Sequence, residues 1–436
     1  MEDTSRSQPI STQTQEIAKQ AIEYPEMVFT TLAHRIDVEW LREAYRQTNK
    51  SSAAGIDGIT AAAYRAKLDE NLQELQQRLK SGRYKAPPVE RVWIDKEDGR
   101  KRPIGKPTLE DKIVQRAVVM LLEPIYEQEF YEFSHGFRTG HSPHQALHEL
   151  REQCQQQNIN WIIDADVSGF FDELGHDQLR EFIKRRVNDG GIMKLIGKWL
   201  NAGVMEEGKL SYAEKGSPQG GVISPLLANI FLHYVLDEWY EQEVKPRLKG
   251  QSFLLRFADD FIIGCELESD ARRVLAVLPK RFERYGLTIN PEKTKLVKFG
   301  QPPRKEQPSP KNGTFDFLGF THYWAKSRRG YWVIKRKTAR KRQRRTIKSL
   351  WQWCKENRHL PLAEQYQMLC LKLRGHYQYF GIRSNSRQLE EVYQQAIAGW
   401  RYWLNRRDNH RKVIWGKFEK ILTNFTLPKP RIIHAI

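Results

Sequence analysis

Residues 253–265 read FLLRFADDFIIGC, two apolar runs on either side of a pair of aspartates. This pattern predicts a β-hairpin with Asp259 and Asp260 at its tip. Two adjacent carboxylates between apolar strands repel each other and are costly to remove from water, and a bound metal ion relieves both costs. Aspartate is also common in solvated turns. The pair alone therefore fits either a metal site or an ordinary turn.

A second group of carboxylates lies upstream, in residues 160–167 (NWIIDADV). The apolar run predicts a buried strand that ends near Asp166. A strand end beside a hairpin tip can bring distant carboxylates around two Mg²⁺ ions roughly 3.5–4 Å apart. Asp164, on the same face of the strand, and Asp172, in the following turn, are alternatives to Asp166.

The rest of the chain mixes helices and strands without the regular alternation of a doubly wound sheet, which favours an α+β body followed by a helical domain. A basic, proline-punctuated loop is expected after residue 95, and a linker over 301–313. Further strands are expected at 89–94, 315–320 and 331–334. Helices are expected at 64–79, 109–123 (closed by Pro124), from Pro143, after the loop GSPQGG, at 176–188, 192–202 and 270–285, and from 337 onward.

The net charge of +19 is unevenly distributed along the 436 residues. Residues 1–300 hold 42 basic and 45 acidic side chains (net −3), which leaves 30 and 8 (net +22) for residues 301–436. A polyanionic partner, nucleic acid or an acidic membrane surface, is expected. No apolar stretch is long enough to predict a transmembrane helix, and the polar N-terminus does not resemble a signal peptide. The four cysteines form no CxxC pair, so we expect a reducing, cytoplasmic setting without a zinc ribbon.

Residues 335–348 carry nine Lys or Arg side chains and no acid. Such a run repels itself unless an anion lies nearby. Seven of the twelve tryptophans follow residue 320, and basic side chains mixed with aromatic rings suit RNA. The rings fit a helical core equally well, and we expect most of Trp351, Trp400, Trp403 and Trp415 to be core. RNA contacts are expected from Arg336, Arg340, Arg344 and Arg345.

A series of motifs in this order resembles the successive palm motifs of reverse transcriptases: DADVSGFFD (164–172), GSPQGGVISPLLANIFL (216–232), RFADDF (256–261), GLTINPEKTK (286–295) and FDFLGF (315–320). Two earlier segments look like the finger motifs of that family, KRPIGKPTLEDKIVQRAV (101–118) and EFSHGFRTGHSPHQAL (132–147). Three later segments are similar to the maturase domain of group II intron-encoded proteins, GHYQYFGI (375–382), RYWLNRRDNHRK (401–412) and LPKPRIIH (427–434).

The resemblance implies a right-hand polymerase fold, with α+β fingers and palm followed by an α-helical thumb/maturase domain. The expected organisation is a flexible N-terminal segment (1–30), fingers with an N-terminal extension (31–160), a palm (161–334) and a thumb (335–436). The implied form of the family lacks the HNH endonuclease domain, because the His and Cys clusters of that nuclease are not found.

The implied activity is RNA-directed DNA synthesis: addition of dNTPs to a DNA primer 3′-OH on an RNA template, with two Mg²⁺ ions or Mn²⁺ in their place. The implied partners also include a structured intron RNA, whose splicing the protein assists. Two alternatives stay open. One is a domesticated, defence, repair or CRISPR-associated reverse transcriptase, and the other is an RNA-binding maturase with little polymerase activity.

The resemblance also assigns roles to individual residues. Asp166 and Asp259 are the implied metal ligands, with Asp260 as partner carboxylate and the backbone carbonyl of Val167 as a further ligand. For the incoming nucleotide, the resemblance implies that Phe171 is a gate against the 2′-hydroxyl and that Gln219 is a contact. Arg102 is the implied triphosphate clamp, with Lys96 and Arg100 as weaker candidates for that clamp. Lys293 is the implied general acid for pyrophosphate, with Lys295 as alternative, and Leu318 and Gly319 resemble the primer-grip hairpin.

The sequence departs from the family pattern at three positions. Phe257 stands where the family tetrapeptide has tyrosine, Lys106 adds a charge to the finger motif, and Ser168 replaces an expected lysine. None of these differences removes an implied metal ligand.

Overall fold

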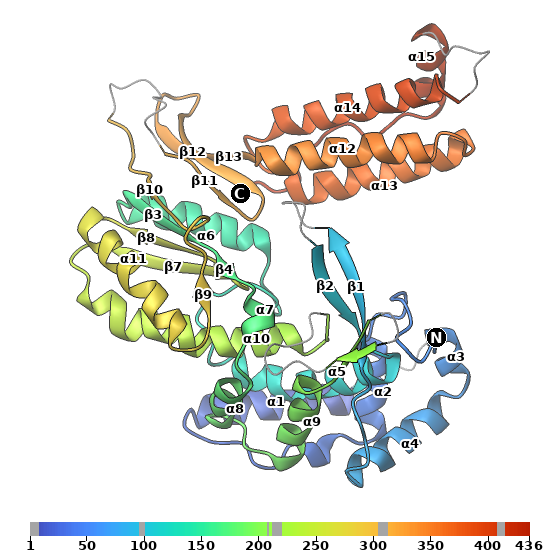
Figure 1. Cartoon of the computed structure of the whole chain (residues 1–436). Coiled ribbons are helices and arrows are strands. Elements are labelled where there is room, and N and C mark those ends of the chain that lie inside the picture. Colours follow the sequence, from blue (N-terminus) through green and yellow to red (C-terminus); the bar gives the residue numbers. More distant parts are fainter. Residues whose placement is uncertain (1–7, 96–100, 207–208, 212–219, 304–312, 408–414) are drawn as a thin grey trace. The chain divides into compact units, whose positions relative to one another are not determined.

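The computed structural model describes residues 8–95, 101–206, 209–211, 220–303, 313–407 and 415–436 (Figure 1). The chain forms two compact units. The first comprises Met1–Ser142, Ile163–Ile263 and Ser269–Lys295, and the second comprises Pro143–Ile162, Gly264–Glu268 and Leu296–Ile436. Among the described residues, no helix combines the length and the apolar character that a membrane crossing needs.

Helices α1 (Gln8–Glu23), α2 (Val38–Gln47) and α5 (Leu109–Tyr126) pack together in the first unit. Helix α5 is apolar around most of its circumference, which is why it is buried on nearly all sides. A sheet in the order β2-β1-β5-β6 accompanies them. Its strands are β1 (Val89–Asp95), β2 (Lys101–Lys106), β5 (Val204–Glu206) and β6 (Lys209–Ser211).

Three expectations for this region are wrong. Residues 101–106 form strand β2 rather than a loop, because they pair antiparallel with β1, and Pro103 is tolerated because β2 is an edge strand. The helix expected at 64–79 is broken at Lys67 into α3 (Ala61–Ala66) and α4 (Leu68–Lys80). Pro124 lies inside the last turn of α5 instead of closing it, where its missing N–H removes a single helical hydrogen bond.

A second sheet has the strand order β10-β3-β8-β7 (Figure 1). Its strands are β3 (Trp161–Ala165), β7 (Ser252–Phe257), β8 (Asp260–Cys265) and β10 (Lys295–Lys298). The hairpin predicted at 253–265 is confirmed. Helix α11 (Glu268–Glu283) packs on β8 through stacked rings of Phe261 and Phe282, 5.9 Å apart.

The first unit also contains several shorter elements. Strand β4 (Val167–Ser168) pairs with β9 (Thr288–Ile289), and α7 (Phe170–Glu173) follows β4 directly. Helices α8 (His176–Lys184) and α9 (Gly190–Leu200) come next. The buried helix α10 (Ser224–Leu232) continues into π-helical turns at His233–Asp237 and Tyr240–Val244.

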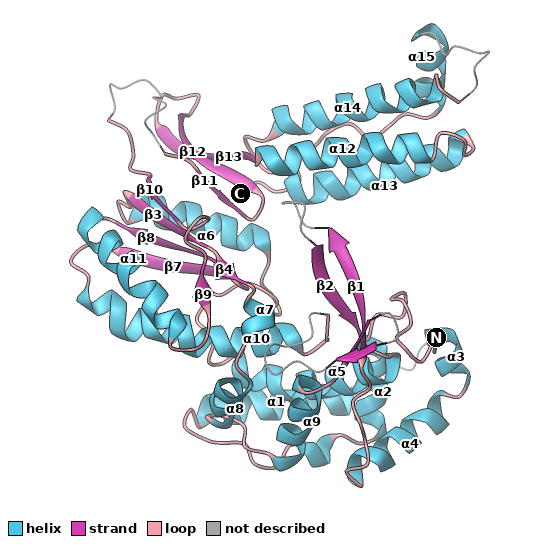
Figure 2. Ribbon diagram, viewed as in Figure 1, coloured by secondary structure: helices cyan, strands magenta, loops and turns pink. Residues whose placement is uncertain are grey.

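The second unit combines an antiparallel sheet with helices that lie side by side (Figure 2). The sheet contains β11 (Phe315–Phe317), β12 (Phe320–Lys326) and β13 (Trp332–Thr338), and α6 (Pro143–Gln156) packs against β13. Helices α12 (Arg340–Glu356), α13 (Leu362–Phe380), α14 (Ser386–Leu404) and α15 (Trp415–Asn424) follow. Trp400 is fully buried among them, as expected, whereas Trp415 is 52% exposed and is not a core residue.

Candidate active site

The aspartate hairpin has a tight, partly exposed tip. Ala258 joins β7 to β8 with a left-handed φ of 58°, a conformation that costs an L-residue about 1–2 kcal/mol. Asp259 is half-buried and Asp260 is exposed, so both carboxylates lie near solvent. The surrounding structure must therefore hold this turn in place.

The strand order brings Asp166 to the same end of the sheet. Strand β3 lies beside β8, and the N–H of Asn160 donates to the carbonyl of Cys265 at 3.1 Å. The start of β3 thus lies beside the end of β8, and the two strands run antiparallel. Asp166, one residue beyond β3, lies at the sheet end where Asp260 begins β8 and Asp259 immediately precedes it.

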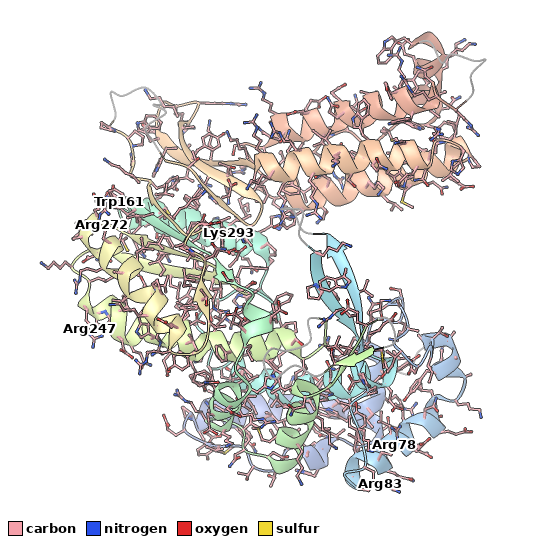
Figure 3. The ribbon with its side chains drawn as sticks, viewed as in Figure 1. Arg78, Arg83, Trp161, Arg247, Arg272 and Lys293 are labelled. Carbon is pink, nitrogen blue, oxygen red and sulfur yellow. The ribbon has the colours of Figure 1, made fainter. Side chains whose placement is uncertain are left out.

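Asp166 is held by the loop between β9 and β10. Its carbonyl accepts a hydrogen bond from the N–H of Asn290 at 2.8 Å, and its amide lies 3.4 Å from Oγ1 of Thr294. Lys293, labelled in Figure 3, places its Nζ 2.9 Å from Oδ2 of Asp166. Of the two lysines that the sequence leaves open, Lys293 contacts the carboxylate, whereas Lys295 is an exposed residue of β10.

The donor set fits magnesium. The Asp166 side chain is 34% exposed and already receives one cation, the ammonium of Lys293. Along a strand, successive carbonyls point to opposite sides, so the Val167 carbonyl points away from β9, toward which the Asp166 carbonyl is directed. No three His, Cys, Asp or Glu residues gather into a preformed site within the described ranges. Mg²⁺ commonly takes one or two protein carboxylates and completes its shell with substrate phosphates and water.

Two adjacent phenylalanines after Asp166 have different surroundings. Phe170 is 2% exposed and packs edge-to-face against Phe231, with ring centroids 6.2 Å apart. Phe171 is half-buried and contacts Phe170 at 5.3 Å. Phe170 is therefore a core residue, and Phe171 keeps part of its ring surface available to a ligand.

Several predicted nucleotide contacts lie outside the described residues: Lys96, Arg100, Gln219 and the side chain of Arg102. The backbone of Arg102 pairs with Ile94 in the β1–β2 ladder. Gly220, directly after Gln219, has a φ of 112°, and a Cβ there would overlap the carbonyl oxygen of Gly105 in β2. The backbone of Gly220 thus lies against β2, the strand that carries Arg102.

A buried network ties Ile223, the residue before α10, to α5, and no sequence pattern pointed to it. Asp111 accepts hydrogen bonds from the Tyr84 hydroxyl (2.5 Å), Trp199 Nε1 (2.7 Å) and Gln115 Nε2 (2.9 Å). Gln115 Oε1 in turn accepts from the backbone N–H of Ile223 at 3.2 Å. Burial raises the pKa values of both Asp111 and Tyr84. The sequence signal for this network is the pair Asp111 and Gln115, which lie one turn apart in the largely apolar helix α5.

A second buried network supports the hairpin itself and was also missed. Arg256 and Asp237 are both fully buried and form an ion pair with 2.5 Å between Nη2 and Oδ2. Arg256 Nη1 also donates to Oδ1 of Asn229 at 2.9 Å and to the carbonyl of Ala258 at 3.1 Å. An arginine within an apolar strand is the signal that could have indicated it.

The basic run divides between a strand and a helix. Arg340, Arg344 and Arg345 are exposed on α12. Arg336 lies in β13, is 2% exposed and donates from Nη1 to the carbonyl of Leu147 at 2.9 Å. Burial lowers the pKa of Arg336 to about 10. The expectation that Arg336 faces RNA is thus wrong for this structure, because the two-residue period of a strand turns its side chain inward.

The family described as "Reverse transcriptase (RNA-dependent DNA polymerase)" matches residues 94–322, which are 229 of the 436 residues and include the carboxylates at the sheet end. The chain therefore belongs to the reverse transcriptase family, together with group II intron-encoded proteins and intron maturases.

The chain is similar to three named proteins over parts of their length. Protein YkfC of Escherichia coli is 35% identical over 294 residues, 59% of this chain and 76% of YkfC. The group II intron-encoded protein LtrA of Lactococcus lactis is 37% identical over 221 residues, 50% of this chain and 36% of LtrA. The nuclear intron maturase 1 of Arabidopsis thaliana is 31% identical over 91 residues, 21% of this chain and 12% of the maturase. The matched region thus spans about a third of LtrA.

Proposed function

We propose that the protein is an RNA-directed DNA polymerase that adds dNTPs to a primer 3′-OH on an RNA template, and that it also binds a structured group II intron RNA as a splicing maturase. The observation that carries the proposal is the meeting of Asp166 with Asp259 and Asp260 at one sheet end, inside the region that matches the reverse transcriptase family. These retained carboxylates argue against a maturase whose polymerase function is vestigial.

The proposed polymerase keeps the fingers, palm and thumb that the sequence implies, whereas residues 8–23 of the segment expected to be flexible form helix α1, which packs on α5. Fingers would occupy 31–160, the palm 161–334 and the thumb 335–436. We place it in the cytoplasm, where RNA and dNTPs are present and where its four buried, free cysteines stay reduced.

Each residue has a defined task in this proposal. Asp166 and Asp259, with Asp260 and the Val167 carbonyl beside them, would hold two Mg²⁺ ions. When bound, the ions lower the pKa of the primer hydroxyl and offset the negative charge on the triphosphate. Lys293, already 2.9 Å from Asp166, would donate a proton to the leaving pyrophosphate. Arg102 and Gln219, with Lys96 and Arg100 nearby in the sequence, would hold the nucleotide.

The choice of substrate tests the proposed function. Purified protein is given an annealed DNA primer on an RNA template, with Mg²⁺ and either dNTPs or NTPs. The proposal expects extension with dNTPs and much less with NTPs. Preferential extension with NTPs would instead indicate an RNA polymerase.

Replacing Phe171 with Ala is expected to raise the incorporation of ribonucleotides relative to deoxyribonucleotides by about 10- to 100-fold, because an apolar wall rejects one added hydroxyl by about that factor. In this proposal the half-buried ring of Phe171 forms the apolar wall that would meet the 2′-hydroxyl. Single-nucleotide incorporation with dCTP and CTP measures the ratio. An unchanged ratio in an active variant would remove Phe171 from this role.

Replacing Lys293 with Leu is expected to lower the maximal rate of incorporation by about 100-fold, because general acid catalysis contributes at least about that factor. The KM for dNTP should change little, since the proton is transferred only during the reaction. Lys295→Leu, two residues away in β10, is the matched control and should stay within a few-fold of wild type. Equal losses in both variants would contradict the assignment of Lys293.

A further inference from the structure

Arg256 lies in strand β7 of the hairpin, two residues before Ala258, and its guanidinium forms hydrogen bonds with several partners. Nε donates to Oδ1 of Asp237 at 2.8 Å and Nη2 donates to Oδ2 at 2.5 Å, a bidentate pair between two side chains with no exposed surface. Nη1 donates to Oδ1 of Asn229 at 2.9 Å and to the carbonyl of Ala258 at 3.1 Å. The same guanidinium thus joins the π-helical turn after α10, helix α10 itself and the hairpin tip.

A buried ion pair of this kind is poorly explained by stability alone. Removing two charges from water costs about as much as their attraction returns, and apolar side chains of similar volume often serve stability equally well. A planar, bidentate donor does, however, fix geometry. The contact that distinguishes Arg256 from a purely structural pair is the one to the Ala258 carbonyl, because this carbonyl belongs to the peptide that leads into Asp259.

The hairpin tip needs such support. Ala258 has a left-handed φ of 58°, which an L-residue adopts only when its surroundings impose it. The segment 133–136 lies directly against the tip: Arg256 N–H donates to Phe133 O at 2.9 Å, and His135 N–H donates to Arg256 O at 2.8 Å. A Cβ at Gly136 would overlap the backbone nitrogen of Ala258, so the two backbones are in close contact.

Asn229 connects both sides of this arrangement. Its Nδ2 donates to the carbonyl of Gly136 at 2.7 Å, while its Oδ1 accepts from Arg256. The hairpin tip is therefore held from below by Arg256 and from the side by Gly136, and Asn229 links the two. If the guanidinium moved, the Ala258 carbonyl would lose its hydrogen bond to Arg256. The side chain of Asp259, the next residue, would then no longer be held in one orientation.

We propose that Arg256, oriented by Asp237, is a positioning residue: it fixes the peptide between Ala258 and Asp259 and thereby aims the Asp259 carboxylate at the metal ions. The inference rests on the proposed polymerase function. Partners that orient metal ligands typically contribute 10- to 100-fold to metal affinity. Loss of this contact should therefore weaken metal binding while leaving the binding of a primer–template unchanged.

Two variants of the full chain test the proposal. Arg256→Lys keeps the charge but loses the planar fork. The double variant Arg256→Met with Asp237→Leu removes both charges together, so that neither is left buried without a partner. Arg186→Lys is the matched control, because Arg186 is also buried, pairs with Glu129 and donates to the Met27 carbonyl, without a described contact to the hairpin.

The primary measurement is binding of Mn²⁺ alone, followed by electron paramagnetic resonance. Both Arg256 variants are expected to bind Mn²⁺ about 10-fold or more weakly than wild type, and to need a correspondingly higher Mg²⁺ concentration for half-maximal primer extension. The KM for primer–template should stay near the wild-type value. Circular dichroism and thermal unfolding establish that the double variant is folded.

The outcomes are distinguishable. Folded Arg256 variants that bind Mn²⁺ as tightly as Arg186→Lys would overturn the positioning role, even if wild type is an active polymerase. A wild-type protein that neither binds Mn²⁺ nor extends a primer would instead contradict the proposed function. Weakened Mn²⁺ binding in both Arg256 variants, with the control unchanged, supports the inference.

Discussion

Replacing Asp259 with Asn is expected to lower the rate of RNA-templated primer extension by at least about 10³-fold. The amide keeps the size of the side chain but removes the negative charge that would hold the metal ions, and metal stabilisation of the transition state is worth several kcal/mol, at about 1.4 kcal/mol per factor of ten. Single-turnover incorporation of one dNTP measures the loss. Because Asp259 lies at a partly exposed hairpin tip, the variant should fold normally.

The matched control for this prediction is Asp177→Asn. Asp177 is exposed in the first turn of α8, within the same compact unit and away from the sheet end. It should retain nearly the full rate. An Asp259→Asn protein that extends primers as fast as Asp177→Asn would exclude the hairpin from catalysis.

Replacing Arg340, Arg344 and Arg345 together with Gln is expected to weaken binding of a group II intron transcript by about 10- to 100-fold at low salt. These exposed side chains lie on the first turns of α12, within a run that lacks acidic residues. Each lost phosphate contact should reduce the slope of log affinity against log salt by about 0.7–0.9, so the slope should become shallower by about 2 to 3. Filter binding at several salt concentrations measures both quantities.

A control with the same change in charge distinguishes a specific effect of the three α12 arginines from a general effect of net charge. Lys245, Arg247 and Lys249 are also exposed, and they lie in the other compact unit. Their triple replacement by Gln should alter the salt slope much less. Equal slopes for the two triple variants would show that α12 is not a specific RNA-binding face.

The sequence predicted the centre of the candidate site because its signals are local. The apolar runs on either side of Asp259 and Asp260 defined the hairpin, and the apolar run before Asp166 defined the neighbouring strand. Strand pairing then placed both at one sheet end. For the general acid, the sequence left two candidates, Lys293 and Lys295. The loop geometry that distinguishes them depends on the β4–β9 pairing, which the sequence does not reveal.

Features that depend on contacts distant in sequence could not be predicted. Arg256 and Asp237 are 19 positions apart, and their pairing requires the π-helical turn after α10 to lie beneath the hairpin. Residues 101–106 became a strand through pairing with β1, against the loop-forming tendency of proline and glycine. Arg336 was expected to contact RNA as part of the basic run 335–348, whereas the β12–β13 register makes it an inward-facing strand residue.

The most direct test of the central claim is single-turnover incorporation of a dNTP by the wild-type chain on a DNA primer annealed to an RNA template, with and without Mg²⁺. The account predicts Mg²⁺-dependent extension by wild type that is lost in Asp259→Asn prepared in parallel. Folded wild-type protein that binds the primer–template yet forms no extended product, with either Mg²⁺ or Mn²⁺, would contradict it.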